Sequence, residues 1–384
     1  MCWPRELIGI VIGLCLVPMV AACSNPGTQA PPAAQNPPPA AKPAAAPASS
    51  AAASPAASAA PAERPASSPP AEAVTLNVEN FSSVANVGMY IANERGYFRE
   101  EGIAINWVPF TNGADEIPAL ATGQLDIGGP TADSSFFNAV ARGIELKIVA
   151  TKGSQAPGHG YGAFVARKDL VDSGQLRDYC DLRGKRIAVV GRGIASEADL
   201  AKATAQCNMT VADVDEVYMG APDQMAALAN GSIDIGMLFE PFTANIVQQG
   251  VAVRWKGYDE IYPDHQYGVV IYSPVFVQQH PNLARRWMVA YIRGLRDYID
   301  EFVNGSNRQA IVDILVQNTL VKDRSLYETM VSVGFNPNGY PNVNSILEDQ
   351  DHYVQRGFLS SKSDPGKFVD LQYVESALGQ LGRR

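Results

Sequence analysis

The sequence contains few of the residue types that most often carry chemistry. It has only four histidines and five cysteines in 384 residues. The histidines, His159, His265, His280 and His352, are far apart and lack the spacing of metal ligands. None of the motifs H-E-x-x-H, C-x-x-C or G-x-S-x-G occurs. We therefore expect no enzymatic activity, no metal and no cofactor.

Basic residues are also in the minority. The chain has 30 Lys and Arg against 39 Asp and Glu, which gives a formal net charge of -9. Proteins that bind nucleic acids present an excess of positive charge to the phosphate backbone. The acidic balance therefore argues against nucleic acid as a partner.

A long apolar run is present only near the N-terminus, as LIGIVIGLCLVPMVAAC over residues 7–23. The run is short for a membrane-spanning helix and ends in small residues, which is typical of an export signal. Its last four residues, VAAC, resemble a bacterial lipobox, in which the cysteine becomes the lipidated first residue of the mature protein. We therefore predict a lipoprotein signal peptide at residues 1–22 and a lipid on Cys23. An uncleaved membrane anchor is the alternative, and both place the rest of the chain outside the inner membrane.

The segment that follows is almost entirely Ala, Pro and Ser up to about residue 71. It has too few large apolar side chains to offset the entropy of ordering, and its prolines favour an extended chain. We predict that residues 23–73 form a disordered tether. The composition of an ordinary globular protein begins at Val74. Two cysteines lie in this folded part, and Cys180 and Cys207 either pair in an oxidising compartment or remain buried thiols.

One phrase occurs twice in the folded part, as ALATGQLDIG from Ala119 and as ALANGSIDIG from Ala227. Each copy predicts an amphipathic helix that ends at a glycine, Gly123 or Gly231, followed by a short strand. Strands and helices alternate around both copies, which predicts mainly parallel sheets with helices on their faces. Each half is therefore expected to be one α/β lobe.

Two strand-like segments that begin Tyr-Gly, at residues 161 and 267, lie on either side of the second half. We predict that residues 74–164 begin the first lobe, 165–267 form the second lobe, and 268–384 return to the first lobe and end in helices that pack on it. Two crossings between the lobes form a double hinge, about which the lobes can bend but not separate.

The segment VGMYIANERGYFREEGIAINWVPF, residues 87–110, carries a family resemblance. It resembles the pattern A-x-E-x-G-Y-F-x-x-E-G of the nitrate/sulfonate/taurine and thiamine-precursor binding proteins of ABC importers. LATGQLDIGG and LFEPF also match that family. The resemblance extends from Val74 to the C-terminal helices and implies the two-lobed type II periplasmic-binding fold. Fungal thiamine-precursor synthases share the fold, but their cysteine-rich motif is absent here.

The resemblance implies an exported receptor that closes its cleft on a small polar organic molecule and delivers it to an ABC permease. A sulfonate, a taurine-like compound, a carboxylate and an aminopyrimidine are the candidate ligands. We expect a monomer, lipid-anchored to a membrane and located in the periplasm or at the cell surface. The alternatives are an adaptor that senses a ligand for a membrane signalling receptor, and an enzyme on the same fold.

Ligands of open α/β sheets bind beyond the carboxyl ends of the strands. The loops that follow the predicted strands therefore supply the candidate ligand-binding residues, and Phe81 offers a flat wall among otherwise polar side chains. Asn112 and Ser196 are also candidate helix caps, as is Asp223. The polar candidates are Asn80, Ser83, Asn86, Asn112, Thr131, Asp133, Arg192, Ser196 and Glu240.

The charge of the ligand remains open from the sequence. Arg192, the Gly193 backbone and the helix start near Ser196 favour an anion. Glu240, directly before Pro241, favours an amine or a hydroxyl donor. A zwitterion offers both. The loop that contains Arg192 reads G-x-G-x-x-S. It lacks one glycine of the dinucleotide-binding motif, so no nicotinamide cofactor is expected.

Asp126 and Asp234 occupy the same position in the two copies of the repeated phrase. Each stands at the start of its short strand, whereas ligands are expected beyond the other end. We therefore predict that both carboxylates fix the turn from helix to strand by accepting hydrogen bonds from nearby loop N–H groups.

Overall fold

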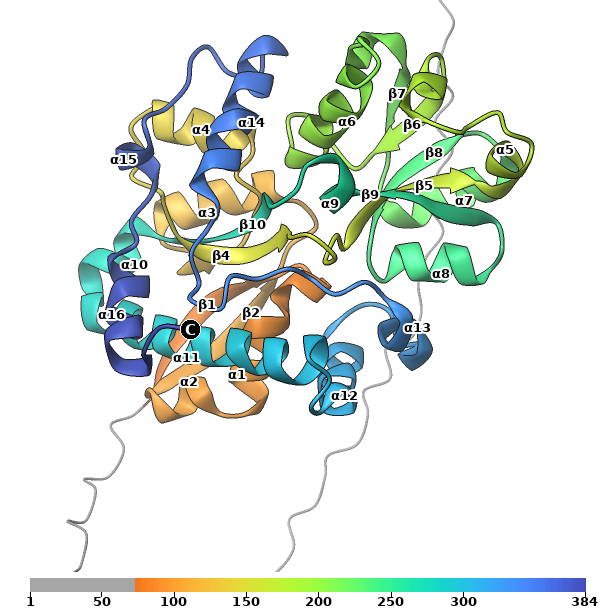
Figure 1. Ribbon diagram of the computed structural model, residues 1–384. Helices are drawn as coiled ribbons and strands as arrows, with labels where there is room; N and C mark the ends of the chain where they lie inside the picture. The colour runs from red at the N-terminus through yellow and green to blue at the C-terminus, as the bar shows by residue number, and fades with distance from the viewer. Residues whose placement is uncertain (1–72) are drawn as a thin grey trace, which may run out of the picture. The chain divides into compact units, whose positions relative to one another are not determined.

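The computed structural model describes residues 73–384 (Figure 1), so the predicted signal peptide, Cys23 and nearly all of the predicted tether lie outside the described residues. No helix in the described part is long and apolar enough to cross a membrane. The described chain contains two five-stranded sheets. In spatial order, the first sheet consists of β2 (Ile103–Pro109), β1 (Val74–Asn80), β3 (Ile127–Gly128), β10 (His265–Tyr272) and β4 (Lys147–Gln155). The second consists of β7 (Asp215–Tyr218), β6 (Arg186–Val189), β8 (Ile235–Phe239), β5 (Gly162–Arg167) and β9 (Ala252–Gly257).

The two sheets share one plan, which confirms the predicted two-lobed α/β fold. In each, three neighbouring strands are parallel and the fourth, β10 or β5, is antiparallel to both of its neighbours. These two strands are the ones that enter a sheet from the other lobe. In each sheet, the carboxyl ends of the parallel strands point towards the other lobe. A strand that enters from the other lobe therefore starts at this edge of the sheet and runs antiparallel to its neighbours.

The crossings between the lobes differ in position from the predicted boundaries. The first crossing lies between the end of β4 and the start of β5, and the second runs through the short helix α9 (Tyr258–Ile261) to β10. The predicted boundaries at 164/165 and 267/268 fall inside β5 and β10. The Tyr-Gly segments are thus sheet strands, because their apolar alternation buries them as the penultimate strand of each sheet.

The first lobe carries the longest helix of the described residues, α11 (Pro281–Tyr298), whose apolar face packs on the sheet through fully buried rings such as Trp287 and Tyr291. Segments from both ends of the described chain cover this lobe (Figure 1). The N-terminal ones are η1 (Val84–Asn86), α1 (Val87–Glu94), α2 (Tyr97–Glu100), η2 (Gly113–Asp115), α3 (Glu116–Thr122) and α4 (Ser134–Ala141). The C-terminal ones are α10 (Pro274–Gln279), α11 (Pro281–Tyr298), η5 (Ile299–Val303), α12 (Arg308–Asn318), α13 (Arg324–Thr329), α14 (Val343–Gln355), α15 (Pro365–Phe368) and α16 (Gln372–Leu381).

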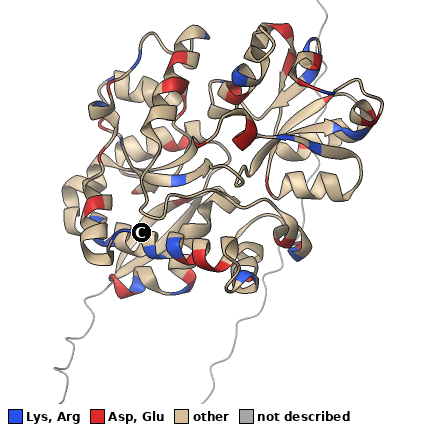
Figure 2. Cartoon of the chain, in the orientation of Figure 1, with Lys and Arg blue, Asp and Glu red and all other residues tan. Residues whose placement is uncertain are grey.

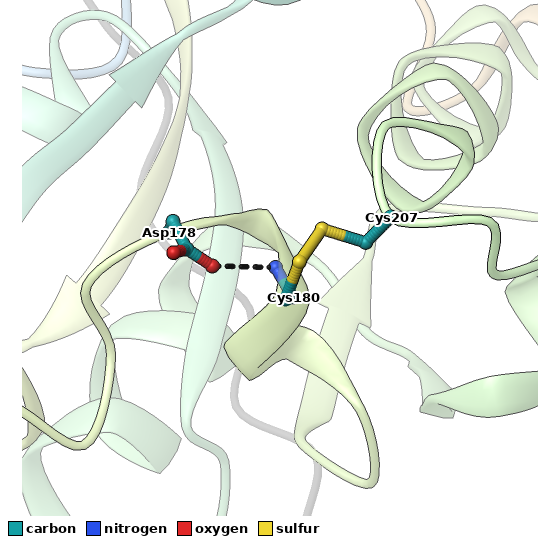
Figure 3. A group of neighbouring side chains, drawn as sticks. All are labelled: Asp178, Cys180 and Cys207. Carbon is teal, nitrogen blue, oxygen red and sulfur yellow. Dashed lines mark hydrogen bonds between the residues drawn. A yellow bond between two sulfur atoms is a disulfide. The ribbon is translucent and has the colours of Figure 1, made fainter.

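The second lobe is smaller and contains a disulfide. Its segments are α5 (Lys168–Asp172), η3 (Tyr179–Leu182), α6 (Ala195–Ala205), η4 (Val211–Asp213), α7 (Ala221–Asn230) and α8 (Phe242–Gln248). Cys180 and Cys207 are bonded, with their Cα atoms 5.1 Å apart, so the open alternative of two free thiols is wrong (Figure 3). The bond ties η3 to the end of α6. Acidic and basic residues are interspersed along the backbone of both lobes (Figure 2).

The repeated phrase forms the same joint in both lobes. The glycine stops and the acceptor role of the aspartates are confirmed, but the N–H groups belong to the neighbouring strands β1 and β6 and not to nearby loops. Helices α3 and α7 end at Gly123 and Gly231, which adopt the left-handed conformation with φ of 73° and 76°. Asp126 Oδ2 accepts the backbone N–H of Asn77 at 2.8 Å. Asp234 Oδ2 accepts that of Arg186 at 2.9 Å. Each carboxylate thus fixes its strand to the neighbouring parallel strand.

Two predicted helix caps are wrong. Helix α6 begins at Ala195 after an extended Ile194, so Ser196 lies inside its first turn. Helix α7 begins at Ala221, because Pro222 supplies the helical φ one position earlier than Asp223. The predicted cap at Asn112 is confirmed, since its side chain accepts the N–H of Asp115 at 3.1 Å.

Candidate functional site

A cavity of about 540 Å³ lies at the edge where the parallel strands of both lobes end. Its walls include seven of the ten predicted site residues: Phe81, Ser83, Asn112, Thr131, Asp133, Arg192 and Glu240. Asn80, Asn86 and Ser196 are absent from these walls. The structure thus brings together residues that are up to 159 positions apart in the sequence, as Phe81 and Glu240 are (240 − 81 = 159).

Asn80 and Asn86 support the loop that carries Phe81. Asn80 Oδ1 accepts the N–H of Ser82 at 2.8 Å and the hydroxyl of Tyr90 at 2.6 Å. Asn86 is fully buried, and its amide donates to Glu79 Oε1 at 2.9 Å. Both side chains are therefore occupied behind the cavity wall. Ser196 is buried too, and its hydroxyl has no hydrogen-bond partner among the described residues.

Lys152 on β4 lines the cavity but was not predicted. Its ammonium lies 2.7 Å from Glu79 Oε1 and 4.9 Å from the centre of the Phe81 ring. Both members of the ion pair are almost fully buried. A Cβ at Gly129 would lie 2.2 Å from Glu79 Oε1 and 2.4 Å from Lys152 Nζ, so this position requires glycine. Strand β4 also contains Thr151, Ser154 and Gln155, so its sequence does not single out Lys152.

The two carboxylates in the cavity wall are occupied by backbone N–H groups. Asp133 Oδ1 caps α4 by accepting the N–H groups of Ser135 at 2.9 Å and Phe136 at 3.0 Å. Glu240 accepts the N–H of Ala244 at 3.0 Å and that of Val331 at 3.2 Å. Burial raises the pKa of Glu240 to about 7. The other oxygen of Asp133, Oδ2, accepts only the Thr131 hydroxyl at 3.5 Å, so it is the least engaged carboxylate oxygen of the two residues.

Several donors in the same wall remain available. The hydroxyl of Tyr161 makes no hydrogen bond to a described residue, and burial raises its pKa, so it keeps its proton. The Ser82 hydroxyl likewise has no partner in the described part of the chain. Arg192 forms no ion pair with a described residue, and its guanidinium lies 5.1 Å from the Tyr218 ring. The loop behind it is fixed, because Gly193 N–H donates to Glu197 Oε2 at 2.6 Å.

The C-terminal segment closes one side of the cavity, which was not predicted. Thr319, Leu320 and Val321 line the cavity between α12 and α13, and Tyr327 lines it from α13. The Leu320 side chain is 71 % exposed. The C-terminal helices pack on the first lobe as expected, but Val331 also contacts Glu240 of the second lobe. The prediction that the C-terminal helices pack on the first lobe was therefore incomplete, because it left out their contact with the second lobe.

Comparison with known proteins agrees with this architecture. Residues 84–301 match the family model described as NMT1/THI5 like. The chain belongs to this family. The predicted family resemblance is thereby confirmed.

Two relatives with similar sequences differ in the ligands that their names give. A protein assigned as an aliphatic sulfonates-binding protein in Bacillus subtilis (strain 168) is 23% identical over 299 residues, covering 76% of this chain and 84% of that one. The riboflavin-binding protein RibY of Chloroflexus aurantiacus is 26% identical over 294 residues, covering 75% and 73%.

Solved structures share the fold. The aliphatic sulphonate binding protein SsuA from Escherichia coli has a TM-score of 0.63 at 17% identity, covering 79% of this chain and 92% of that one. The nitrate-binding protein NrtA from Synechocystis PCC 6803 has a TM-score of 0.66 at 13% identity, covering 81% and 90%. The desulfurization enzyme DSZB also has this fold, with a TM-score of 0.58 at 14% identity over 80% of this chain and 99% of that one. Most of these neighbours are binding proteins, but the fold also supports enzymes.

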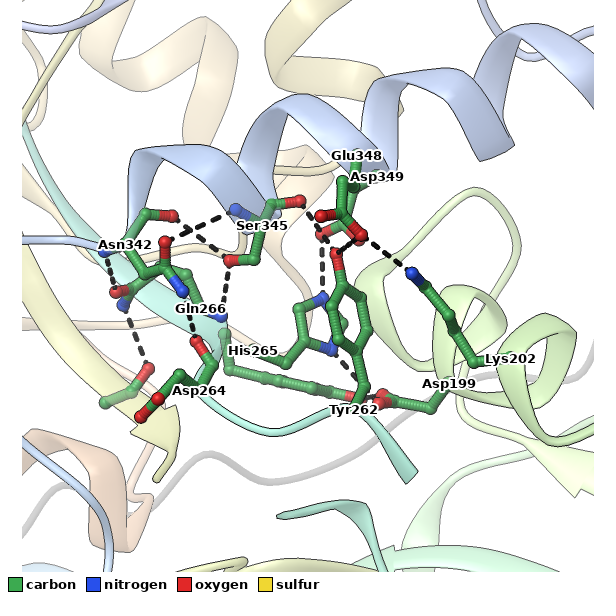
Figure 4. A network of polar contacts seen from close by, with 12 residues as sticks. Asp199, Lys202, Tyr262, Asp264, His265, Gln266, Asn342, Ser345, Glu348 and Asp349 are labelled. Atoms are coloured by element: carbon green, nitrogen blue, oxygen red, sulfur yellow. Dashed lines mark hydrogen bonds and ion pairs between the residues drawn. The ribbon is translucent and has the colours of Figure 1, made fainter. Parts of the chain in front are cut away.

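A buried polar network joins the lobes of this NMT1/THI5-like chain at the second crossing (Figure 4). His265, at the start of β10, lies between Asp199 of α6 and Asp349 of α14. Its Nδ1 is 3.0 Å from Asp199 Oδ1, and its Nε2 is 2.8 Å from Asp349 Oδ2. Burial alone would lower the pKa of His265, but the two carboxylates raise it to about 10. The imidazole is therefore a cation, and it lies behind the cavity wall.

Further contacts link the same two helices and the loops beside the cavity. Lys202 of α6 pairs with Glu348 of α14 at 2.7 Å (Figure 4). Arg356, at the end of α14, pairs with Glu216 of β7 at 2.9 Å. Ser134 N–H donates to Gly193 O at 2.9 Å across the cavity mouth. These contacts hold the lobes together along one side of the cavity. His159, the other histidine next to a crossing, contacts Ser332 instead of the cavity.

Proposed function

We propose that this chain is the extracytoplasmic solute receptor of an ABC importer, and that it closes its two lobes on a small organic anion. The observation that carries the proposal is the pairing pattern of the cavity wall. Its carboxylates, Asp133 and Glu240, are occupied by backbone N–H groups, whereas Ser82, Tyr161 and Arg192 remain as donors. An amine would find only Asp133 Oδ2 weakly engaged, whereas an anion finds several donors.

The binding mechanism follows from the position of these donors. Ser82 belongs to the first lobe and Arg192 to the second, so an anion that contacts both stabilises the closed arrangement. A ligand shifts such an equilibrium by the difference in its affinity for the two states. The second lobe moves about the two crossings, and the closed form is what the permease recognises. The names of the sulfonate-binding and nitrate-binding relatives support an anionic ligand.

The location of the receptor is part of the proposal. Export, a lipid on Cys23 and a flexible tether would hold a monomeric binding domain close to its permease. The disulfide between Cys180 and Cys207 supports an oxidising compartment outside the cytoplasm.

Mass spectrometry of small molecules released from the purified full-length chain tests the function. We expect an organic anion that leaves the protein chemically unchanged. Calorimetric titration with that compound should show a loss of about tenfold to a hundredfold in affinity for Arg192→Gln, the range for a hydrogen bond to a charged group. The matched control is Arg142→Gln, because Arg142 lies outside the cavity at the end of α4.

The same preparation separates the alternatives. A released cation, or an unchanged affinity in Arg192→Gln, would contradict the anion receptor. Turnover of the bound compound would favour an enzyme. Uptake into vesicles that contain the permease distinguishes a transport receptor from a sensing adaptor, because an adaptor binds the ligand without supporting uptake.

A further inference from the structure

Aromatic side chains form much of the cavity wall. Both lobes, the first crossing and the C-terminal segment contribute them. The six rings are Phe81, Tyr161, Phe239, Phe242, Tyr267 and Tyr327. A cavity for a small alkyl anion needs donors but no extended aromatic wall, so these rings require their own explanation.

Three of the rings lie next to one another in a row, with their planes inclined by 46° and 65° from one ring to the next. The centres of the Tyr161 and Phe239 rings are 5.5 Å apart, and those of Phe239 and Tyr267 are 5.1 Å apart. The Tyr267 hydroxyl donates to Asp199, which fixes the end of this row. Because their packing already holds these rings, a flat ligand would contact them without the entropic cost of ordering loose side chains.

The remaining walls complete a site of considerable size. Phe81 comes from the first lobe, and its loop is held by the two hydrogen bonds to Asn80 Oδ1. Phe242 begins α8 of the second lobe. The cavity volume of about 540 Å³ falls in the range that buries most of a drug-sized molecule. A two-carbon anion would leave the aromatic wall in contact with water.

We propose that the ligand is a ring-bearing organic anion, an aromatic sulfonate or carboxylate. Its ring lies within the aromatic wall formed by Phe81, Phe242 and the row Tyr161–Phe239–Tyr267, and its acidic group binds Arg192. This inference rests on the proposed receptor function and specifies its ligand class. The aromatic row supplies the apolar contact area, and the unpaired guanidinium supplies the charge-assisted hydrogen bonds.

Titration calorimetry on the full-length chain with matched probes tests the ligand class. Naphthalene-2-sulfonate and naphthalene-2-carboxylate carry both features, ethanesulfonate has only the charge, and 2-naphthylmethanol has only the ring. We expect the better of the two naphthalene anions to bind at least about tenfold more tightly than either of the last two, equivalent to about 1.4 kcal/mol. Comparing the two anions identifies the acidic group.

A pair of variants locates the ring-binding surface. Phe81→Leu should weaken binding of the naphthalene anion by about fivefold, within the range of an aromatic contact, and leave ethanesulfonate almost unchanged. Phe335→Leu is the matched control, because Phe335 is also half-buried but packs edge-to-face against Tyr298 outside the cavity. Phe242→Leu provides a second test should Phe81→Leu lower the melting temperature.

The outcomes separate this inference from the function on which it rests. Equal affinity for ethanesulfonate and the naphthalene anion, or equal losses for both probes in Phe81→Leu, would overturn the ring-bearing ligand and leave an anion receptor. Preference for 2-naphthylmethanol would overturn the anionic group in both proposals. A chain that binds no probe and releases no small molecule would overturn the receptor function itself.

Discussion

Replacing His265 with leucine should destabilise the protein by about 4 kcal/mol at pH 7. The Asp349 carboxylate has only this imidazole as a partner, because its Oδ1 has none among the described residues and its Oδ2 contacts His265. Without the cation, Asp349 must take up a proton to remain buried. An ordinary carboxyl has a pKa of about 3.9, and keeping it neutral at pH 7 costs about 1.4 kcal/mol for each pH unit between those values.

The stability of His265→Leu should change with pH in a direction that identifies the cause of the loss. In His265→Leu, the folded state binds a proton that the unfolded state releases above about pH 4, so its stability rises as the pH falls. In the parent protein, the pKa of His265 is raised from its ordinary 6.5 to about 10. Its contribution is therefore fully present below about pH 6.5 and is lost as the pH rises towards 10. The parent also gains some stability between pH 7 and 6, so the difference between the two proteins should shrink by about 2 kcal/mol in total from pH 7 to 5, most of it below pH 6.

Urea unfolding at pH 5, 6 and 7, followed by circular dichroism, measures this difference. The double variant His265→Leu/Asp349→Leu is the control, and it should recover at least half of the loss because the orphaned carboxylate is gone. A loss below about 1 kcal/mol at pH 7, or a difference that stays constant with pH, would refute the reasoning, since the expected cost comes from protonating Asp349.

Three further predictions concern features outside the cavity. Asp126→Asn and Asp234→Asn should each lower the free energy of unfolding by about 1–3 kcal/mol and leave ligand affinity unchanged, as thermal melts and titrations on both would reveal; lost binding with an unchanged melt would contradict their structural role. Reducing the disulfide, which joins residues 27 positions apart, should cost about 3.5 kcal/mol by loop entropy, measurable as a lower urea midpoint in dithiothreitol; an unchanged midpoint would exclude that contribution. Cys23→Ser should release the protein from membranes with no change in affinity, and a variant that still sediments with membranes would count against lipidation.

The local part of the fold was predictable because its signals are local. In each copy of the repeated phrase the glycine stop and the aspartate are only three residues apart, and the structure places the glycine at the helix end and the aspartate at the strand start as expected. The helix starts were harder, since Ser196 has the right residue type but the extended conformation belongs to Ile194. A side chain that can cap a helix does not by itself fix where the helix begins.

The sequence predicted the cavity residues that follow the carboxyl ends of parallel strands, but not those at the amino ends of antiparallel strands. The rule that ligands bind beyond carboxyl ends found the loops carrying Phe81, Thr131 and Arg192. It missed Tyr161 and Tyr267, because β5 and β10 are antiparallel and bring their amino ends to the cavity. The direction of these strands depends on which segments cross between the lobes.

The polar network at the crossing was beyond sequence reasoning for a different reason. His265 contacts partners 66 and 84 residues away, one on either side in the chain. Neither spacing is a recognised motif, and the three residues meet only after both lobes have formed. Lys152 and Glu79, 73 residues apart, were missed for the same reason.

The order of strands has a consequence for how the chain folds. The second sheet draws all of its strands from one continuous stretch, Gly162–Gly257, whereas β10 of the first sheet lies between β3 and β4 and arrives only after that stretch. Until β10 inserts, β4 has no strand partner in its sheet. The second lobe can therefore acquire native structure alone, while the first must wait for a distant segment at a higher cost of loop closure. Pulsed hydrogen exchange during refolding should accordingly protect the amide of Ile187 before that of Val149.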